Sequence, residues 1–343
     1  MVETFERSLG LVGVGYWGKN LARNFHALGA LRSICEHDVE RLRLHQEKYP
    51  DVSMTSSFDE MLADPEIKSI AIAAPAFQHY ELARQALLAG KDVFVEKPMC
   101  MTVQEAHDLN HLATSEQRIL MVGHILNYHP CVQRLYQMVQ AGELGTLQYI
   151  VSNRLALGSI RTEENALWNF APHDISVILG LCGYRLPEEV RCTGSECVSK
   201  GVADISLTTL RFGADLSAHI YVSWLNPFKE QRLTIVGSAG LAVFDDTKPW
   251  GEKLLVYRNH VAWSEAGIPS INPNEMEQVQ VEEKEPLKEE CRHFLTCCHD
   301  RSVPVTSGAE GLRVMRVLEA AQQSMNADGQ STAIPELAEA SLR

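Results

Sequence analysis

The sequence lacks several features that would place it in a narrow class of protein. No apolar run approaches the ~18 residues that a membrane-spanning helix needs, and no signal peptide opens the chain. Low-complexity segments and internal repeats are also missing. We therefore expect a soluble cytoplasmic protein with no membrane partner.

Cysteine is present without a metal-binding pattern. The nine cysteines show no Cys-x-x-Cys spacing. The neighbouring pairs Cys192/Cys197 and Cys297/Cys298 have no histidine at metal-ligand spacing. An odd number of scattered thiols is typical of reduced intracellular cysteines. The sequence predicts no metal site.

An excess of basic residues is missing as well. Lys and Arg number 31 against 44 Asp and Glu, which gives a formal net charge of −13. This balance argues against nucleic acid or an anionic membrane as the main partner. It leaves open a small anionic substrate held by a few local cations.

A length of 343 residues favours two domains.

The first third of the chain alternates strand-like and helix-like segments. Short apolar runs predict buried strands, and segments with a 3.6-residue period predict helices between them. Thr102 and Glu105 have the spacing of a capping box that opens a further helix. The predicted strands are 8–14, 31–35, 69–74, 91–97 and 118–124, and the helices include 18–29 and 79–90. This alternation predicts a doubly wound parallel sheet, a Rossmann domain over 1–124.

Three glycines follow the first predicted strand in the segment GVGYWG. Gly13, Gly15 and Gly18 have the G-x-G-x-x-G spacing, between a strand and a helix. The first allows a tight turn, the second lets a pyrophosphate approach the backbone, and the third lets helix and strand pack closely. A plain turn would also use glycine, but this context favours dinucleotide binding.

The second predicted strand ends at Glu36, 18 residues beyond Gly18. A carboxylate there accepts hydrogen bonds from the ribose hydroxyls of an adenosine and repels a 2′-phosphate. Arg32 and Arg41 lie nearby in the sequence and are possible ligands of a 2′-phosphate. We predict NAD as the cofactor in preference to NADP.

The segment FVEKPM ends another strand of the same predicted sheet. Its carboxyl edge is where ligands of such folds bind, so Lys97 is expected beside the cofactor. Nearby positive charge and desolvation favour a neutral lysine that accepts a proton from a substrate hydroxyl. Glu96 is placed to orient it, and Pro98 fixes the backbone after it. A solvated ion pair at a strand end is the alternative.

The rest of the chain, 125–343, predicts an α+β domain with a large, mostly antiparallel sheet. Its strand-like runs are 146–155, 205–212, 214–225, 232–240, 241–246 and 253–257, and helices are predicted at 286–300 and 308–325. Such a sheet is suited to covering the reactive face of a cofactor and to offering a flat surface to another subunit.

Together with VGHILNYHP and PHDISV, these motifs resemble the Gfo/Idh/MocA family of NAD(P)-dependent oxidoreductases over nearly the whole chain. SNRLALGSIRTEENALWNFAPHDISVIL is similar to the branch of WlbA-like and WbpB-like enzymes. That branch oxidises the 3-hydroxyl of UDP-N-acetylglucosaminuronic acid in surface-polysaccharide synthesis. The resemblance implies a homo-oligomer, usually a tetramer and otherwise a dimer. A free polyol or inositol as substrate, and a non-catalytic NAD-binding regulator, remain alternatives.

The resemblance also implies the site residues. Lys97 and His173 are the expected catalytic pair. Where many relatives have an Asp-x-x-x-His segment, this chain has Asn169, which cannot act as a base. Ala74 replaces a common threonine. Expected cofactor contacts are Gly13, Gly15, Tyr16, Trp17, Gly18, Glu36, Ala74, Pro75, His79, Glu96, Lys97 and Trp168, and expected substrate contacts are Lys97, Asn127, Arg154, Arg161, Asn169, His173, Asp174, Lys229 and Arg232.

For several of these residues, the local sequence also predicts a role. Pro172 suits the first turn of a helix, so His173 is expected beside exposed N–H groups that keep its imidazole neutral. Asp174 then points away from it and has a structural or sugar-hydroxyl role. Trp168 either walls the nicotinamide or fills core. The basic side chains of the predicted substrate set suit an anionic nucleotide sugar, although each is equally well explained as a surface charge. They are Arg154, Arg161, Lys229 and Arg232.

Overall fold

The computed structural model describes residues 5–158, 160–162, 164–258, 261–264, 266–271 and 276–334. They form two compact units, one containing 5–128 and 285–315 and the other 129–284 and 316–334. The sequence had placed everything after residue 124 in the second domain. In the structure, helix α8 (Pro286–Asp300) belongs to the first unit because its apolar face packs on α1 (Gly18–Ala27).

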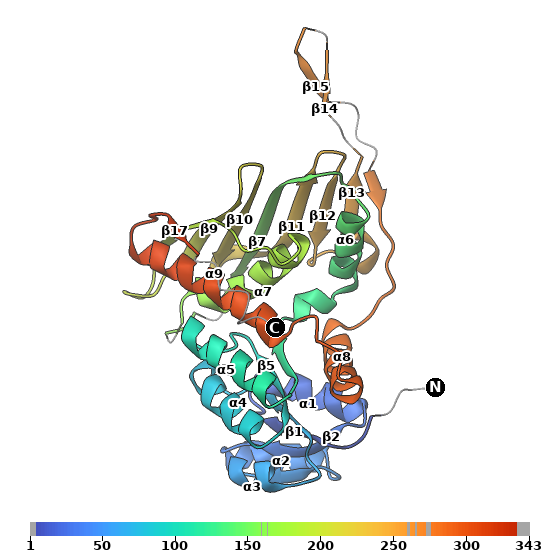
Figure 1. Ribbon diagram of the computed structural model, residues 1–343, viewed down its shortest axis with the longest axis vertical. Coiled ribbons are helices and arrows are strands. Elements are labelled where there is room, and N and C mark those ends of the chain that lie inside the picture. Colours follow the sequence, from blue (N-terminus) through green and yellow to red (C-terminus); the bar gives the residue numbers. More distant parts are fainter. Residues whose placement is uncertain are drawn as a thin grey trace. The chain divides into compact units, whose positions relative to one another are not determined.

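The first unit is built on a six-stranded parallel sheet of order β3-β2-β1-β4-β5-β6 (Figure 1). The strands are β1 (Leu9–Val12), β2 (Leu31–Cys35), β3 (Ser53–Thr55), β4 (Ser69–Ile72), β5 (Asp92–Glu96) and β6 (Leu120–Gly123). The order reverses between β1 and β4, the place where such folds bind ligands. The predicted Rossmann sheet is confirmed.

Helices cover both faces of this sheet. They are α1, α2 (Val39–Lys48), α3 (Phe58–Ala63), α4 (His79–Leu88), α5 (Val103–Ser115) and α8, with 3₁₀ turns η1 (Ala76–Gln78) and η2 (Ile125–Tyr128). The predicted capping box at Thr102 and Glu105 opens α5. Helix α2 was not predicted, since none of its residues is buried and it shows no apolar period.

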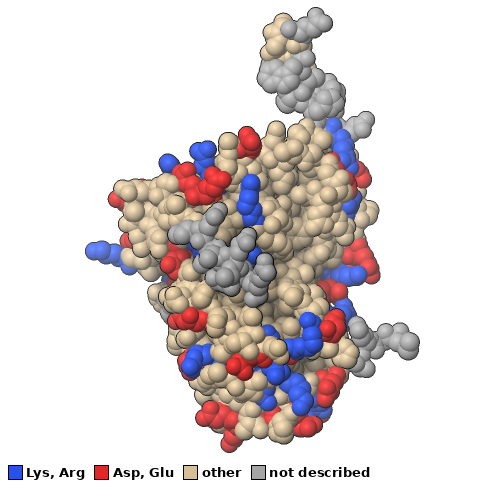
Figure 2. Space-filling model, in the orientation of Figure 1, with Lys and Arg blue, Asp and Glu red and all other residues tan. Residues whose placement is uncertain are grey.

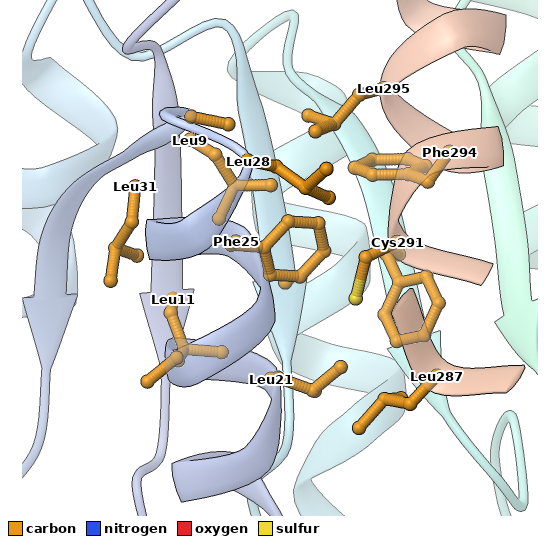
Figure 3. Close-up of a cluster of buried hydrophobic side chains, with 14 of the residues drawn as sticks. Leu9, Leu11, Leu21, Phe25, Leu28, Leu31, Leu287, Cys291, Phe294 and Leu295 are labelled. Atoms are coloured by element: carbon orange, nitrogen blue, oxygen red, sulfur yellow. The ribbon is translucent and has the colours of Figure 1, made fainter. Parts of the chain in front are cut away.

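The core between α1 and α8 is apolar and includes three phenylalanines, two of which are labelled in Figure 3. Phe25 of α1, Phe94 of β5 and Phe294 of α8 form edge-to-face pairs with ring centroids 5.7 to 6.4 Å apart. Leu21, Leu287 and Cys291 extend the same cluster. Pairs of this geometry add to the burial energy of the rings, so residues far apart in the chain hold α8 on the sheet.

The second unit has a nine-stranded sheet of order β16-β13-β12-β11-β7-β10-β9-β8-β17. Its strands are β7 (Leu147–Leu157), β8 (Glu189–Ser195), β9 (Ile205–Phe212), β10 (Leu216–Ser223), β11 (Leu225–Gly237), β12 (Leu241–Asp245), β13 (Leu254–Tyr257), β16 (Met276–Gln278) and β17 (Thr332–Ala333). All pairings are antiparallel except that of β7 with β10. The predicted mostly antiparallel sheet is confirmed. A separate hairpin joins β14 (Val261–Trp263) and β15 (Pro269–Ile271).

Helices α6 (Pro130–Gln140), α7 (Ala166–Leu181) and the later part of α9 (Gly308–Asn326) lie on one face of this sheet (Figure 1). On the strands, buried residues alternate with residues such as Leu207 that are exposed on the other face. Acidic and basic side chains are interspersed on the face of the protein seen in Figure 2. Among the described helices, none combines the length and apolar composition needed to cross a membrane.

Candidate active site

The glycine-rich turn after β1 has the close backbone packing that its spacing predicts. Gly13 has a φ of +84°, and a β-carbon there would lie 2.8 Å from the carbonyl oxygen of Ala73. A β-carbon at Gly18 would lie 2.1 Å from the carbonyl oxygen of Gly13. Larger residues are therefore excluded at both positions, and α1 begins directly at the turn, so the positive end of its dipole lies at the glycine loop.

A cavity of about 390 Å³ opens beside this turn, at the carboxyl edge of the parallel sheet. It brings together six of the predicted cofactor residues, from the glycine turn, the end of β2 and the loop after β4. It is lined by Val12, Gly13, Gly15, Tyr16, Cys35, Glu36, His37, Arg41, Phe58, Ala73, Ala74, Pro75, Gln78 and Leu82. Phe58, Gln78 and Leu82 were not predicted, because they lie on separate elements and carry no local signal.

Glu36 is held in place at the end of β2. The backbone N–H of Val14 donates to its Oε2 (3.0 Å) and that of Asp38 to its Oε1 (3.1 Å). The guanidinium of Arg41 lies 3.8 Å from Oε2. The carboxylate thus faces the cavity with a fixed orientation, and the glycine turn, helix end and carboxylate together fit an adenosine dinucleotide.

We expect Glu36→Ser to weaken NAD binding about tenfold and to relax the preference over NADP. The serine loses the acceptor for the ribose hydroxyls, and Arg41 is released for a 2′-phosphate. Glu40→Ser, an exposed change on α2, is the control. Titration of both dinucleotides checks this, and tighter NADP than NAD binding by the unmodified protein would contradict the role of Glu36.

Glu96, at the end of β5, is buried under the same edge of the sheet. The indole N–H of Trp17 donates to its Oε1 (2.5 Å), and the backbone N–H of Lys97 lies 3.3 Å from Oε2. A β-carbon at Gly123 would lie 2.8 Å from Oε2, so a larger residue on the neighbouring strand would displace this carboxylate. Burial raises the pKa of the Glu96 carboxyl to about 7, although Trp17 and Lys97 act to lower it. Lys97 follows directly and is half-buried.

Two other predicted contacts of this unit have backbone partners. The ring nitrogens of His79 each lie 2.8 Å from a carbonyl oxygen, of Pro98 and of Ala74. His79 therefore ties the loops that follow β4 and β5. The side-chain amide of Asn127, in η2, donates to the carbonyl of His124 (3.2 Å).

In the second unit, helix α7 starts earlier than predicted. It begins at Ala166, and the side chain of the N-cap residue Asn165 accepts from the N–H of Trp168 (3.1 Å). Pro172 lies inside the helix. The expectation that His173 lies in the first turn is therefore wrong, and the helix end does not account for a neutral His173. The N-cap asparagine was the stronger start signal.

Charged residues of this unit pair with one another. Arg154 donates to both oxygens of Asp174 (2.8 and 3.1 Å), and Ser152 donates to the same carboxylate (2.7 Å). Arg154 and Asp174 are both largely buried, so this pair anchors α7 to β7. Arg232 lies 3.5 Å from Asp245 and 3.6 Å from Glu230, whereas Lys229 is exposed.

Near the start of α7, the side chain of Trp168 donates to Gln322 of α9 (3.0 Å). The amide of Asn169 donates to Glu164 (2.6 Å), which also lies 3.3 Å from Arg161. Glu164 was not singled out by the sequence, since two adjacent glutamates before a helix have no distinctive spacing. Among the described residues, no group of three or more His, Cys, Asp or Glu side chains is arranged to hold a metal ion.

Comparisons with known proteins identify the family. Residues 7–124 match the oxidoreductase family with an NAD-binding Rossmann fold, and residues 132–243 match the GFO/IDH/MocA C-terminal domain. The chain belongs to the Gfo/Idh/MocA oxidoreductase family. Its first unit is the family's NAD-binding Rossmann domain.

Similar proteins cover most of the chain. UDP-N-acetylglucosamine 3-dehydrogenase of Acidithiobacillus ferrooxidans is 26% identical over 312 residues, 89% of this chain and 93% of that protein. A solved structure of that enzyme, GnnA, has a TM-score of 0.82 at 25% identity and covers 94% of this chain and 98% of its own. GenD2 from gentamicin A biosynthesis, solved with NAD, has a TM-score of 0.82 at 21% identity over 97% of this chain and 98% of its own, which shows likeness of fold.

Proposed function

We propose that this protein oxidises the 3-hydroxyl of a UDP-linked N-acetylated glucose sugar, in the synthesis of surface-polysaccharide sugars. The observation that carries the proposal is the position of Lys97, directly after β5, at the same sheet edge as the glycine turn and the cavity. A positioned amine there is suited to accept a hydroxyl proton. The likeness to UDP-N-acetylglucosamine 3-dehydrogenase supports the substrate class.

NAD, when bound, would supply the acceptor for a hydride. The glycine turn and Glu36 would hold the dinucleotide, and Lys97 or His173 would take the proton from the sugar hydroxyl. Lys97 lies beside a buried carboxyl, Glu96, and its loop is tied by His79, so its backbone position is fixed. A fixed base is the condition for efficient proton transfer.

Two sugars of this class are candidates. The sequence favours the uronate, UDP-N-acetylglucosaminuronic acid, because several arginines suit a carboxylate. UDP-N-acetylglucosamine has no carboxylate and so needs no arginine to bind one. Two observations favour it: Arg154 is paired with Asp174, and Arg161 and Arg232 each lie beside an acidic side chain. We therefore place UDP-N-acetylglucosamine first and the uronate second.

The test is a panel of substrates followed by NADH absorbance. We expect turnover of at least one UDP sugar, competition by UDP, and no oxidation of free N-acetylglucosamine or myo-inositol. Remote contacts to the nucleotide orient the reacting hydroxyl, so truncated substrates lose rate as well as affinity. Rapid oxidation of myo-inositol, unaffected by UDP, would favour a polyol dehydrogenase. NAD binding without turnover of any sugar would favour a regulator.

Arg161→Ala and Arg232→Ala separate the two UDP sugars. If the uronate is the substrate, each change should raise its KM about tenfold, the effect expected for loss of a charge-assisted hydrogen bond. The KM for UDP-N-acetylglucosamine should change less. Equal effects on both sugars would place the arginines at the diphosphate.

We also propose that the protein is a homo-oligomer, a tetramer or a dimer, assembled through the second unit. The sheet face opposite α7 carries Leu207 and half-buried Tyr221 and Tyr257. Exposed apolar faces of this kind typically meet another surface. A monomeric mass in solution by light scattering would contradict this.

A further inference from the structure

The end of β5 lies directly beside the cavity at the glycine turn. Ile72 of β4 pairs with Val95 of β5, so Ala73 and Glu96 come next on the two neighbouring chains. Adjacent strands of a sheet are about 4.8 Å apart, and Ala73 lines the cavity. Glu96 therefore lies about one strand spacing from the wall of the cavity.

Two side chains join the segment around Glu96 to the walls of this cavity. Trp17, the last residue of the glycine turn before α1, donates its indole N–H to Oε1 of Glu96 at 2.5 Å. The ring nitrogens of His79 lie 2.8 Å from the carbonyl oxygens of Ala74, which lines the cavity, and of Pro98. The position of the Glu96 carboxyl relative to the cavity is therefore fixed from both sides.

A dinucleotide in this cavity extends toward the end of β5. Dinucleotides lie across the carboxyl edge of such sheets, at the point where the strand order reverses. The adenosine is assigned to Glu36 at the end of β2 and the pyrophosphate to the turn after β1, so the nicotinamide falls on the side of β4 and β5. The oxidised ring is positively charged and the reduced ring is neutral. A charge on Glu96 therefore acts differently on the two forms.

Ionisable groups from several elements face the Glu96 carboxyl. They are Lys97 at the same strand end, His124 after β6, and Glu290 and Cys291 on α8. Burial holds the pKa values of Glu290 and Cys291 well above their usual ranges, so both are neutral near pH 7. His124 is bonded in turn to Glu310 (2.7 Å).

The Glu96 carboxyl itself changes charge near neutral pH. It is 8% exposed, and burial raises its pKa to about 7, while the indole N–H of Trp17 and the charge of Lys97 act to lower the pKa. A positive charge brought into the neighbouring cavity favours the ionised carboxylate. The coupling is reciprocal, so the ionised carboxylate favours the positively charged ligand by the same factor.

We propose that binding of oxidised NAD is coupled to release of the proton from Glu96, and that Trp17 is the positioning residue that favours this ionisation. The proton passes to solvent, and no covalent bond of the cofactor changes. The site thereby selects a dinucleotide with a cationic ring over the same dinucleotide with a neutral ring. The inference depends on the NAD-binding domain and goes beyond the proposed function, because it does not involve the sugar.

The test compares the Kd for NAD⁺ with the Kd for NADH between pH 5.5 and pH 8.5. The adenosine and the diphosphate are common to both forms, so the titration of groups around them cancels in the ratio of the two Kd values. We expect the preference for NAD⁺ to rise with pH by about threefold to tenfold, since a shift of one pKa unit corresponds to tenfold. Calorimetry in two buffers of different ionisation enthalpy should show proton release at pH 7 with NAD⁺ and much less with NADH.

Two variants assign the proton to its residue. Glu96→Gln has the shape of the protonated carboxyl and should abolish the pH-dependent step. Trp17→Phe removes the indole N–H that lowers the pKa of Glu96, so the step should move to higher pH. Trp250→Phe is the matched control, because the indole N–H of Trp250 donates to a backbone carbonyl, that of Val281 (3.0 Å), in the second unit. It should leave the step unchanged.

Several outcomes overturn the inference. A preference for NAD⁺ that stays constant with pH excludes the coupling, and a step that survives Glu96→Gln assigns the proton to another group. Loss of the step in Lys97→Met, where we expect it to persist at higher pH, would identify that group as the lysine. A step at unchanged pH in Trp17→Phe, or weaker binding of both cofactors with a lower unfolding temperature, removes the positioning role of Trp17. These measurements need no sugar, so failure of the proposed substrate does not affect them.

Discussion

Replacing Lys97 with Met should lower turnover about a hundredfold to ten-thousandfold, the usual contribution of a general base. Methionine keeps the length and apolar stem of lysine but has no group that accepts a proton. NAD affinity should stay nearly unchanged, because the cavity proposed for the dinucleotide is lined by the glycine turn and Glu36 and not by Lys97. Single-turnover kinetics with the preferred UDP sugar and an NAD titration measure the two effects separately.

The control is Lys68→Met, a change at an exposed lysine of the same unit. Among the hydrogen bonds of the described residues, its side-chain amine donates only to the carbonyl of Pro65. This change should leave turnover unchanged. If Lys97→Met retained near-normal turnover, Lys97 would have no part in the proton transfer and His173 would be the remaining candidate. A variant that lost NAD binding as well would point to a role in cofactor positioning.

Glu290→Gln should stabilise the protein at alkaline pH. Glu290 lies on α8 and is 0% exposed. Neither of its carboxyl oxygens has a hydrogen-bond partner among the described residues. Burial raises the pKa of this carboxyl well above its usual range, and the charge of Glu96 raises it further. The unmodified protein therefore buries a carboxyl that ionises only at a free-energy cost.

The direction of the pH dependence follows from this raised pKa. Above the pKa of an unfolded glutamate, about 4.3, the unfolded chain has lost the proton while the folded protein still binds it. Folding then takes up a proton, so the free energy of unfolding falls as the pH rises toward the folded-state pKa. Glu96, with its pKa raised to about 7, contributes a fall of the same sign.

Glutamine has the shape of the protonated carboxyl and does not ionise. At pH 5 the variant and the unmodified protein should differ little. At pH 8 the variant should be more stable by about 1–3 kcal/mol, because each pH unit above the unfolded pKa costs the unmodified protein up to about 1.4 kcal/mol while its folded carboxyl stays protonated. This corresponds to roughly 3–10 °C in the unfolding temperature of a unit of this size.

Thermal unfolding between pH 5 and pH 9 measures the effect. Glu289→Gln is the control, because Glu289 is the adjacent residue, is partly exposed and pairs with Arg292. Its stability should parallel that of the unmodified protein at every pH. If Glu290→Gln behaved in the same way, Glu290 would have a partner that stabilises its charge.

The sequence by itself determined the local structure wherever a periodic apolar pattern was bounded by residues that end a helix or a strand. The strand predicted at 205–212 and the helix predicted at 286–300 have the bounds that were expected. The glycine spacing predicted the turn that forms, because backbone conformation and close packing at Gly13 and Gly18 depend on the residue itself. The prediction from Pro172 was wrong, since a proline indicates the first turn of a helix only when no stronger N-cap residue precedes it. Here that N-cap residue is Asn165.

Only the tertiary structure decided which charged groups meet. In the sequence, nothing distinguishes Glu290 from the other 43 acidic residues. Its burial depends on the packing of α8 against α1, a helix more than 250 residues earlier in the chain. The sequence likewise left Arg154 open to a substrate, whereas the folded sheet places it on Asp174. Periodicity reports which face of an element is apolar. It does not report which distant element covers that face, so the pairing of buried charges is fixed only when the chain folds.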